Sequence, residues 1–443
     1  MLIGFKLRNF RSFSEEQTLS YVMSPDRAHE STHCIRTGVK SVPRLSRAAI
    51  IFGPNAGGKT NLINALATLQ DLVLHSTALT DGEYAERYTP FQFGAWASRP
   101  TEFELDVLLD DIRYRYTLVH DAERVVAERL LVYRTGKSQR WFDRRSDRAR
   151  TAEVWTPFSP SFNGAREVWR KATRSKALFL TTAAQLDSEQ LQPLFRWFER
   201  GLEIVLRDDI DDPSRVVPHL RDRHFKGWAL RMFRSVGIPV DDLRIAEHEL
   251  PAAEPATPRI PPIGNPARAA TRSPIQFLHS RGRRSPVWLD AAFESAGTHR
   301  LLGLLVPLLD AFHNDKLLAI DEFDTSLHPL VARFLIQTLN DPEIVGRGTQ
   351  LLLTSHDTTL MDLEILRRDE IWLAELGSDE ATVLSPVLRA GPRKNEMIGK
   401  GYLRGRYGAV PRIRPGLLAA ALQPSASPER ATKAQRARRG RRS

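Results

Sequence analysis

Cysteine is almost absent: the chain of 443 residues holds only Cys34. One thiol excludes an intramolecular disulfide and a zinc site built on cysteines, and it suits a reducing compartment. A chain of this length exceeds one ordinary domain, so we expect two or more lobes.

Membrane-length hydrophobic runs are also lacking. The longest apolar stretch, residues 301–312, contains Asp310 and is far shorter than the roughly 20 apolar residues of a membrane span. The first apolar run of the chain includes Lys6, Arg8 and Arg11, which is not the pattern of a signal peptide. We therefore expect a soluble, cytoplasmic protein with no membrane partner.

Acidic residues are scarce at the C-terminal end. Residues 424–443 hold seven Lys or Arg and one acid, Glu429, so they supply six of the net charge of +11. The segment is rich in Pro, Ser, Ala and Arg, and we expect a disordered basic tail. Two interpretations stay open: nonspecific contact with nucleic acid, and a solubilising tail with no dedicated partner.

The most informative motif that is present is GPNAGGKT at residues 53–60, which fits G-x-x-x-x-G-K-[ST]. Residues 47–52 predict a buried strand and residues 61–74 a helix. Glycines let backbone N–H groups point at phosphate oxygens, and the helix start adds its positive end. Lys59 can reach the β- and γ-phosphates, and the Thr60 hydroxyl can ligate Mg²⁺. The expected nucleotide-binding residues of this P-loop are Gly53, Asn55, Gly57, Gly58, Lys59, Thr60 and Asn61.

A second apolar run, residues 317–320, ends in Asp321 and Glu322. A central parallel strand is apolar on both faces, and acids at its carboxyl end lie at the sheet edge where ligands bind. We expect Asp321 to hold Mg²⁺, and Glu322 to orient the attacking water or accept its proton. The 262 residues from Lys59 to Asp321 are too many for a compact switch GTPase.

Further motifs keep a fixed order around these acids. ESAGTHR, residues 294–300, places Gly297 24 residues before Asp321 and precedes a predicted helix. DTSLHP, residues 324–329, follows the acids, and a predicted strand then ends before His356, 35 residues after Asp321. This order resembles ABC/SMC-type ATPases, which have a P-loop, a signature helix, strand acids, a D-loop and a switch histidine.

More narrowly, the chain resembles the AAA15-type (OLD-like, RecF-like) ATPases of bacterial defence loci. The resemblance rests on NFRSF at 9–13, GPN and GKTN within 53–61, PTEFE at 100–104, ES-x-GT at 294–298, DE and SLHP within 321–329, and GYLRGRYGAVP at 401–411. It implies an α/β fold, namely an ABC/SMC-type P-loop ATPase head with a mixed sheet, an antiparallel β lobe and a helical lobe. It also implies ATP and Mg²⁺ as ligands.

The resemblance further implies a site shared between two copies, in a homodimer or a higher homo-oligomer. Ser295 and Gly297 of the signature then contact the γ-phosphate bound by the other subunit. His356 senses or polarises that phosphate, and Asp324 couples the two sites. Two ATP molecules at such an interface would hold the copies together until hydrolysis removes them.

Two site residues have open alternatives. ABC-type sites use a glutamine between the strand and helical lobes to ligate Mg²⁺ and sense the γ-phosphate. Gln185 is the first candidate, although it reads equally well as an ordinary helix-start residue, and Gln92 is the second. Arg11 either reaches a nucleotide phosphate or is a surface arginine on a strand.

Periodicity predicts how the chain is organised. Strands are expected within residues 2–20 and 88–150, and helices within 164–204, including one at 188–200, and within 215–237. We predict an N-terminal ATPase lobe at 1–185 with the P-loop and antiparallel strands, a helical lobe with a Pro/Ala-rich linker (251–275) at 186–285, a C-terminal ATPase lobe at 286–423 with the signature, acids, D-loop and histidine, and the tail at 424–443.

The sequence predicts no effector domain. OLD-family nucleases carry a C-terminal Toprim domain with its own acidic metal cluster, and no such grouping follows His356. The resemblance at 294–298 and 401–411, together with the missing effector domain, implies a sensor or scaffold ATPase of an anti-phage defence system that controls a separately encoded effector, expected to be a nuclease. The alternative is a RecF/SMC-like DNA-binding ATPase of DNA repair or maintenance, using a basic patch such as residues 281–284. The near-balanced charge of residues 1–423 counts against that alternative.

Overall fold

The computed structural model describes residues 1–146, 153–210, 215–246, 275–280, 285–393, 396–411 and 417. The chain has two compact units, Met1–Ala409 and Val410–Ser443, and all elements below belong to the first. The predicted linker up to residue 274, the basic patch at 281–284 and the tail lie outside the described residues. The lobe boundaries after residues 185, 285 and 423 stay predictions.

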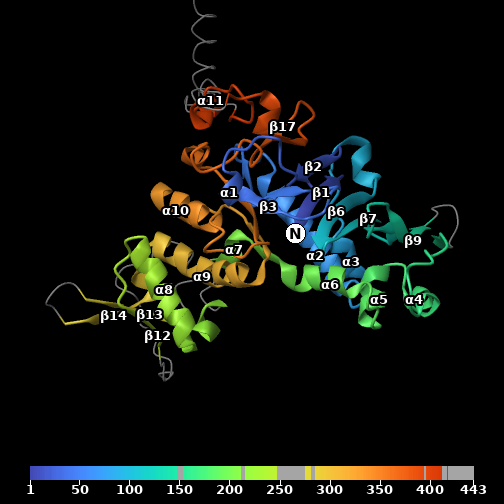
Figure 1. Cartoon of the computed structure of the whole chain (residues 1–443), viewed down its shortest axis with the longest axis horizontal. Coiled ribbons are helices and arrows are strands. Elements are labelled where there is room, and N and C mark those ends of the chain that lie inside the picture. Colours follow the sequence, from blue (N-terminus) through green and yellow to red (C-terminus); the bar gives the residue numbers. More distant parts are fainter. Residues whose placement is uncertain are drawn as a thin grey trace, which may run out of the picture. The chain divides into compact units, whose positions relative to one another are not determined.

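A six-stranded mixed sheet carries the P-loop, and its strand order is β11-β15-β16-β5-β17-β18. Figure 1 labels β17 of this sheet. Its members are β5 (Ala48–Phe52), β11 (Leu202–Val205), β15 (Leu317–Ile320), β16 (Gln350–Ser355), β17 (Ile371–Leu376) and β18 (Thr382–Pro386). All pairs are parallel except that of β17 with β18. Every residue of β5, β15 and β16 is buried, as a central parallel strand requires. The loops after the parallel strands therefore meet at one edge of the sheet.

A seven-stranded antiparallel sheet forms the second layer, in the order β10-β9-β8-β7-β6-β1-β2. Its strands are β1 (Leu2–Arg8), β2 (Gln17–Ser20), β6 (Thr101–Leu109), β7 (Ile112–His120), β8 (Val125–Tyr133), β9 (Gln139–Ser146) and β10 (Glu153–Trp155). Buried positions alternate with partly exposed ones along much of β1 and β8, which is the pattern of a sheet with one face on the core. The predicted antiparallel strands are confirmed.

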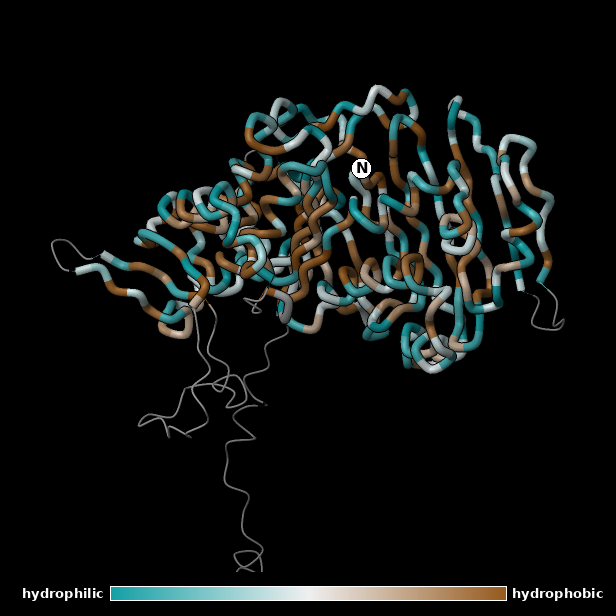
Figure 2. Tube along the Cα trace, turned by 90° about the horizontal axis from the view of Figure 1, so that it is seen from below, coloured by the Kyte–Doolittle hydropathy of each residue, from teal (hydrophilic) through white to brown (hydrophobic). Residues whose placement is uncertain are grey.

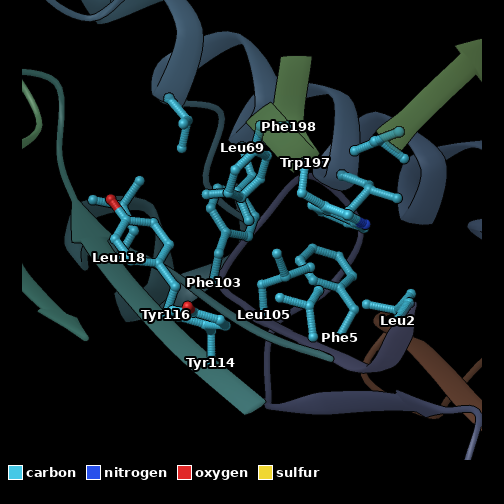
Figure 3. Close-up of a cluster of buried hydrophobic side chains, with 14 of the residues drawn as sticks. Leu2, Phe5, Leu69, Phe103, Leu105, Tyr114, Tyr116, Leu118, Trp197 and Phe198 are labelled. Carbon is cyan, nitrogen blue, oxygen red and sulfur yellow. The ribbon is translucent and has the colours of Figure 1, made fainter. Parts of the chain in front are cut away.

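The main core lies between the antiparallel sheet and helix α2 (Lys59–His75). Figure 3 shows Leu69 of α2 facing Phe103 and Tyr116 of the sheet, with Phe198 beside them. All four side chains are fully buried. In Figure 2 the hydrophobic residues run along the strands and helices of this interior. The same helix therefore begins in the P-loop and anchors it to the largest hydrophobic cluster of the chain.

The remaining helices and strands surround these two sheets. They are α1 (Glu30–His33), β3 (Cys34–Arg36), β4 (Arg44–Ser46), α3 (Asp81–Glu86), η1 (Gly94–Ser98), α4 (Arg166–Ala172), α5 (Phe179–Gln185), α6 (Gln192–Arg196), the π-helix η2 (Trp197–Gly201), α7 (Arg207–Ile210), η4 (Val217–Arg221), α8 (Arg223–Ser235), β12 (Asp242–Ile245), β13 (Ile275–His279), β14 (Val287–Asp290), η5 (Ala291–Phe293), α9 (Ala296–Asn314), α10 (Pro329–Leu339), η6 (Thr358–Leu360), η7 (Val387–Ala390) and α11 (Ile398–Leu403). Strands β12 to β14 form a three-stranded sheet, and β3 pairs with β4.

Two helix predictions differ from the structure. The helical stretch predicted to reach residue 204 ends at Gly201, because β11 joins the edge of the six-stranded sheet. The helix predicted over 215–237 is the 3₁₀ turn η4 followed by α8, which begins where the Asp222 side chain caps it. Neither difference alters the fold class: an α/β fold with a mixed sheet and an antiparallel β lobe is confirmed. None of the helices in the described ranges has the length and apolar character of a membrane span.

Candidate functional site

The P-loop is pressed against the end of the six-stranded sheet. Gly53 has a φ of 154°, and a Cβ there would lie 2.1 Å from the Ala374 carbonyl oxygen. Gly58 has a φ of 94°, and its Cβ would lie 2.0 Å from Thr382 Oγ1. Only glycine fits these two positions. The loop is thus a cradle of bare backbone, as phosphate binding requires.

Lys59 is the charged group of this cradle. Its side chain is buried, and Nζ donates to the carbonyl oxygens of Gly53 and Pro54, both at 2.9 Å. Burial lowers the pKa of Lys59 to about 8, against the pull of nearby acids led by Asp321. The ammonium therefore stays mainly charged at neutral pH while being poorly hydrated, which strengthens its attraction for a phosphate.

Hydrogen bonds of two threonines, Thr60 and Thr354, connect the P-loop to the acids after β15. Asp321 Oδ1 accepts from Thr60 Oγ1 at 3.2 Å and from Thr354 Oγ1 at 2.6 Å, and Thr354 Oγ1 in turn accepts from the backbone N–H of Glu322 at 2.7 Å. The structure thus brings the two predicted metal ligands, Thr60 and Asp321, together. A hydroxyl and a carboxylate are hard oxygen ligands of the kind Mg²⁺ takes beside substrate phosphates. No cluster of three or more His, Cys, Asp or Glu side chains suited to a metal occurs in the described ranges.

Glu322 is held in an unusual backbone conformation, with a φ of 49°. Arg300 of α9 donates to its carbonyl oxygen and, at 3.1 Å, to that of Asp321. On the side chain, Oε2 accepts from Thr325 Oγ1 at 3.3 Å and lies 3.3 Å from Arg207 Nη1. The carboxylate therefore has a defined direction at the sheet edge.

His356 and Asp324 complete the cluster from the next loop. His356 Nδ1 lies 3.4 Å from Lys59 Nζ. Asp324 Oδ2 accepts from the backbone N–H of His356 at 3.3 Å and of Asp357 at 3.1 Å. Burial, and then the Lys59 cation, lower the pKa of His356. The imidazole is thus neutral at physiological pH and can act as a hydrogen-bonding group next to a phosphate.

The signature contacts the loop of the acids through Gly297 and Arg300, but in the described part of the chain Ser295 and Gly297 do not reach the P-loop of their own copy. Ser295 caps α9 by accepting from the Thr298 N–H at 3.1 Å, so the predicted helix begins within the signature motif, at Ala296. A Cβ on Gly297 would lie 2.9 Å from the carbonyl oxygen of Ser326, in the D-loop. Neither residue forms a hydrogen bond with residues 53–61 of its own chain, within the part that the structure describes.

Asn61 and Arg11 lie on the flank of the P-loop. Asn61 Nδ2 donates to Ser12 Oγ at 2.9 Å. Arg11 has a φ of 47° and is exposed in a turn after β1, so it is a surface arginine as the alternative expected, although it does not lie on a strand. Its guanidinium lies 5.5 Å from the Phe10 ring centre and lines a cavity of about 310 Å³ beside α2, and burial lowers its pKa.

Gln185 is not brought to the site, which corrects its assignment. It is the exposed last residue of α5, and α5 packs on the far end of α2, where Thr181 Oγ1 donates to the Val73 carbonyl oxygen at 2.5 Å. Fourteen helical residues separate Val73 from Lys59, which is roughly 21 Å. Gln92 is exposed, and its Nε2 donates to the Pro90 carbonyl oxygen at 2.9 Å. It lies three residues after Thr89, whose carbonyl oxygen accepts from the Arg11 N–H at 2.7 Å.

Three residues of the cluster were not predicted from the sequence: Thr354, Arg300 and Arg207. Thr354 follows an apolar run and is fully buried. A single hydroxyl in a central strand is the sequence feature from which its role could have been predicted. Arg300 lies one turn into α9 and is buried although charged. Arg207 follows β11, and that strand was hidden in a stretch predicted to be helical.

Comparison with known proteins gives one family match. The family model described as "AAA domain, putative AbiEii toxin, Type IV TA system" matches residues 48–362. No curated protein matches the chain. Among solved structures, the SMC head domain from Thermotoga maritima is 15% identical, with a TM-score of 0.39 over 87% of this chain and 98% of that one. The Smc head domain derived from Pyrococcus furiosus, with an extended coiled coil and bound to the C-terminal domain of ScpA, is 10% identical, with a TM-score of 0.39 over 91% and 99%.

The family match contains the whole cluster. It begins at the first residue of β5, includes the signature and the acids, and ends after the loop that carries His356. It spans more than half of the 443 residues. The chain therefore belongs to this AAA-domain family.

Proposed function

We propose that this chain hydrolyses ATP in a site shared by two copies, and that it acts as a sensor ATPase of an anti-phage defence system controlling a separately encoded effector. One observation carries the shared site: the P-loop, both acids and His356 converge, while Ser295 and Gly297 of the same copy form no hydrogen bond with residues 53–61 in the part of the chain that the structure describes. The family description, which names a toxin of a Type IV TA system, supports a role in a system of several components.

The proposed roles follow from the cluster. Lys59 and the P-loop backbone bind the triphosphate, and Thr60 and Asp321 hold Mg²⁺, which would offset phosphate charge. Glu322 orients the attacking water or takes its proton, and neutral His356 hydrogen-bonds near the γ-phosphate. Arg11 is the proposed further phosphate contact. Gln92 replaces Gln185 as the candidate glutamine.

Complementation between two inactive variants tests the shared site. Lys59→Ala removes the P-loop cation, and Ser295→Glu places a like charge where the signature would meet a phosphate. If sites are shared, mixing the two variants regenerates one intact site per mixed dimer, and ATPase activity returns. Activity that stays absent after mixing, while mixed dimers are detected, contradicts a shared site.

The defence role is tested with the neighbouring genes. Co-purification from the native operon is expected to recover the effector with the ATPase, and deletion of either gene is expected to raise phage plating. An ATPase that purifies alone, with no effect of its neighbours on plating, would remove the basis for an effector.

A DNA-binding ATPase is the second candidate, and helix α8 favours it. Its buried face packs Phe225 and Phe233 into the core, whereas its outer face is basic. The exposed arginines there are Arg223, Arg231 and Arg234, with Arg221 just before the helix, and none forms an ion pair within the described ranges. Such a face fits a phosphate backbone.

Duplex DNA separates the two candidates. A DNA-binding ATPase is expected to be stimulated by DNA, with binding that falls steeply with salt and is weakened by Arg231→Glu with Arg234→Glu. Arg200→Glu is the control, since Arg200 is exposed but paired with Glu199. Equal DNA affinity in all three proteins would exclude α8 as the contact.

A further inference from the structure

Arg207, the first residue of α7, follows β11 and contacts the proposed water-orienting carboxylate from outside every motif described above. Its Nη1 lies 3.3 Å from Glu322 Oε2. We propose that Arg207 is a positioning residue for ATP hydrolysis, which holds one oxygen of Glu322 so that the other is directed at the attacking water. The inference rests on the proposed hydrolysis of ATP and adds a residue to it.

The sheet register places these two residues side by side. β11 pairs in parallel with β15, with Val205 opposite Ile320. The pairing continues past the strands, because the Asp321 N–H donates to the Val205 carbonyl oxygen at 3.0 Å. Arg207 lies two residues after Val205, and Glu322 lies two residues after Ile320. The contact is therefore set by backbone hydrogen bonds at the ligand edge of the sheet and not by a chance meeting of long side chains.

The contact restrains one carboxylate oxygen and leaves the other available. Oε2 is shared by Arg207 and Thr325, whereas Oε1 forms no hydrogen bond with any described residue. The Arg207 side chain is 61% exposed and that of Glu322 is 24% exposed. An ion pair this exposed adds little to folding stability. Its consequence is instead the direction of the Glu322 carboxylate.

Alanine and lysine substitutions test this role. Arg207→Ala is expected to lower kcat about fivefold, the scale of an exposed ion pair. The KM for ATP is expected to stay unchanged, because no hydrogen bond or ion pair joins Arg207 to residues 53–60 within the described ranges. Arg207→Lys, which keeps the charge, is expected to recover part of kcat. Arg215→Ala is the matched control, since Arg215 pairs with Glu203 at the same 3.3 Å, and it is expected to behave as wild type.

A double-mutant cycle tests whether Arg207 acts through Glu322. In single-turnover assays with excess enzyme, Arg207→Ala is expected to cause no further slowing in a Glu322→Gln background. The inference would be overturned if the rate reductions of the two single variants multiply in the double variant. A kcat unchanged by Arg207→Ala would overturn it as well. If either result is found while the wild type hydrolyses ATP and Glu322→Gln does not, the role of Arg207 is refuted and the proposed hydrolysis stands. If the wild type shows no hydrolysis, the proposed function fails and this inference with it.

Discussion

Thr354 offers the sharpest test of how the site is built, because one hydroxyl serves both acids. Thr354→Val keeps the shape but removes the donor to Asp321 Oδ1, 2.6 Å away, and the acceptor for the Glu322 N–H, 2.7 Å away. A hydrogen bond to a charged group contributes about 1.5–3 kcal/mol, and an N–H left without a partner costs about 1 kcal/mol or more. We expect the free energy of unfolding to fall by roughly 3 kcal/mol.

Urea unfolding followed by tryptophan fluorescence measures this loss, with the slope of the transition compared between variants. Thr354→Ser is the control: it keeps the hydroxyl and loses one buried methyl, about 0.8 kcal/mol. Mg²⁺-dependent ATP turnover is expected to fall in the valine variant and to persist in the serine variant. A valine variant as stable and active as the serine variant would refute the argument, since the hydroxyl would then contribute nothing.

Four further outcomes are expected. Lys59→Ala should abolish ATP binding in calorimetry, and retained affinity would contradict the P-loop assignment. Glu322→Gln should bind ATP normally, hydrolyse it slowly and accumulate an ATP-locked oligomer in size-exclusion chromatography; hydrolysis at the wild-type rate would exclude Glu322 as the base. Gly58→Ala should lose roughly 2–5 kcal/mol of stability in urea, because left-handed backbone strain adds to overpacking against Thr382. Burial lowers the pKa of His120 to about 4, so the unfolded chain takes up a proton first as the pH falls, and unfolding free energy should drop by about 2 kcal/mol from pH 7.5 to 5. That drop should shrink in His120→Phe, and an equal pH dependence in both proteins would contradict it.

The sequence predicted those parts of the site that are continuous in the chain. The P-loop, with its flanking strand and helix, and the acids after β15 each consist of neighbouring residues whose types state their chemistry. Burial of the two central strands follows from their apolar runs. The order of the parallel strands could not be predicted in this way, because β11 is four residues long and its neighbour is more than 100 residues away. Arg207 was missed for that reason.

Gln185 illustrates the opposite error. Its place after an apolar run and before a helix fits a junction between lobes, and that local pattern is correct. The direction of α2 decides the outcome, since α5 packs at the end of this helix that is remote from the P-loop. No periodicity in residues 178–185 reports which end of another helix they meet. Local sequence therefore predicted the element but not its position.

The contacts of α9 suggest how two shared sites would communicate. Its first turn presents Ser295 and Gly297, which under the proposed function meet the γ-phosphate of the other copy. Arg300, one turn later on the same helix, donates to the carbonyl oxygens of Asp321 and Glu322 in its own copy. A helix moves nearly as a rigid body, so a shift of its first turn is transmitted to both acids. Phosphate contact in one site would in this way adjust the acids of the other, without a separate signalling segment.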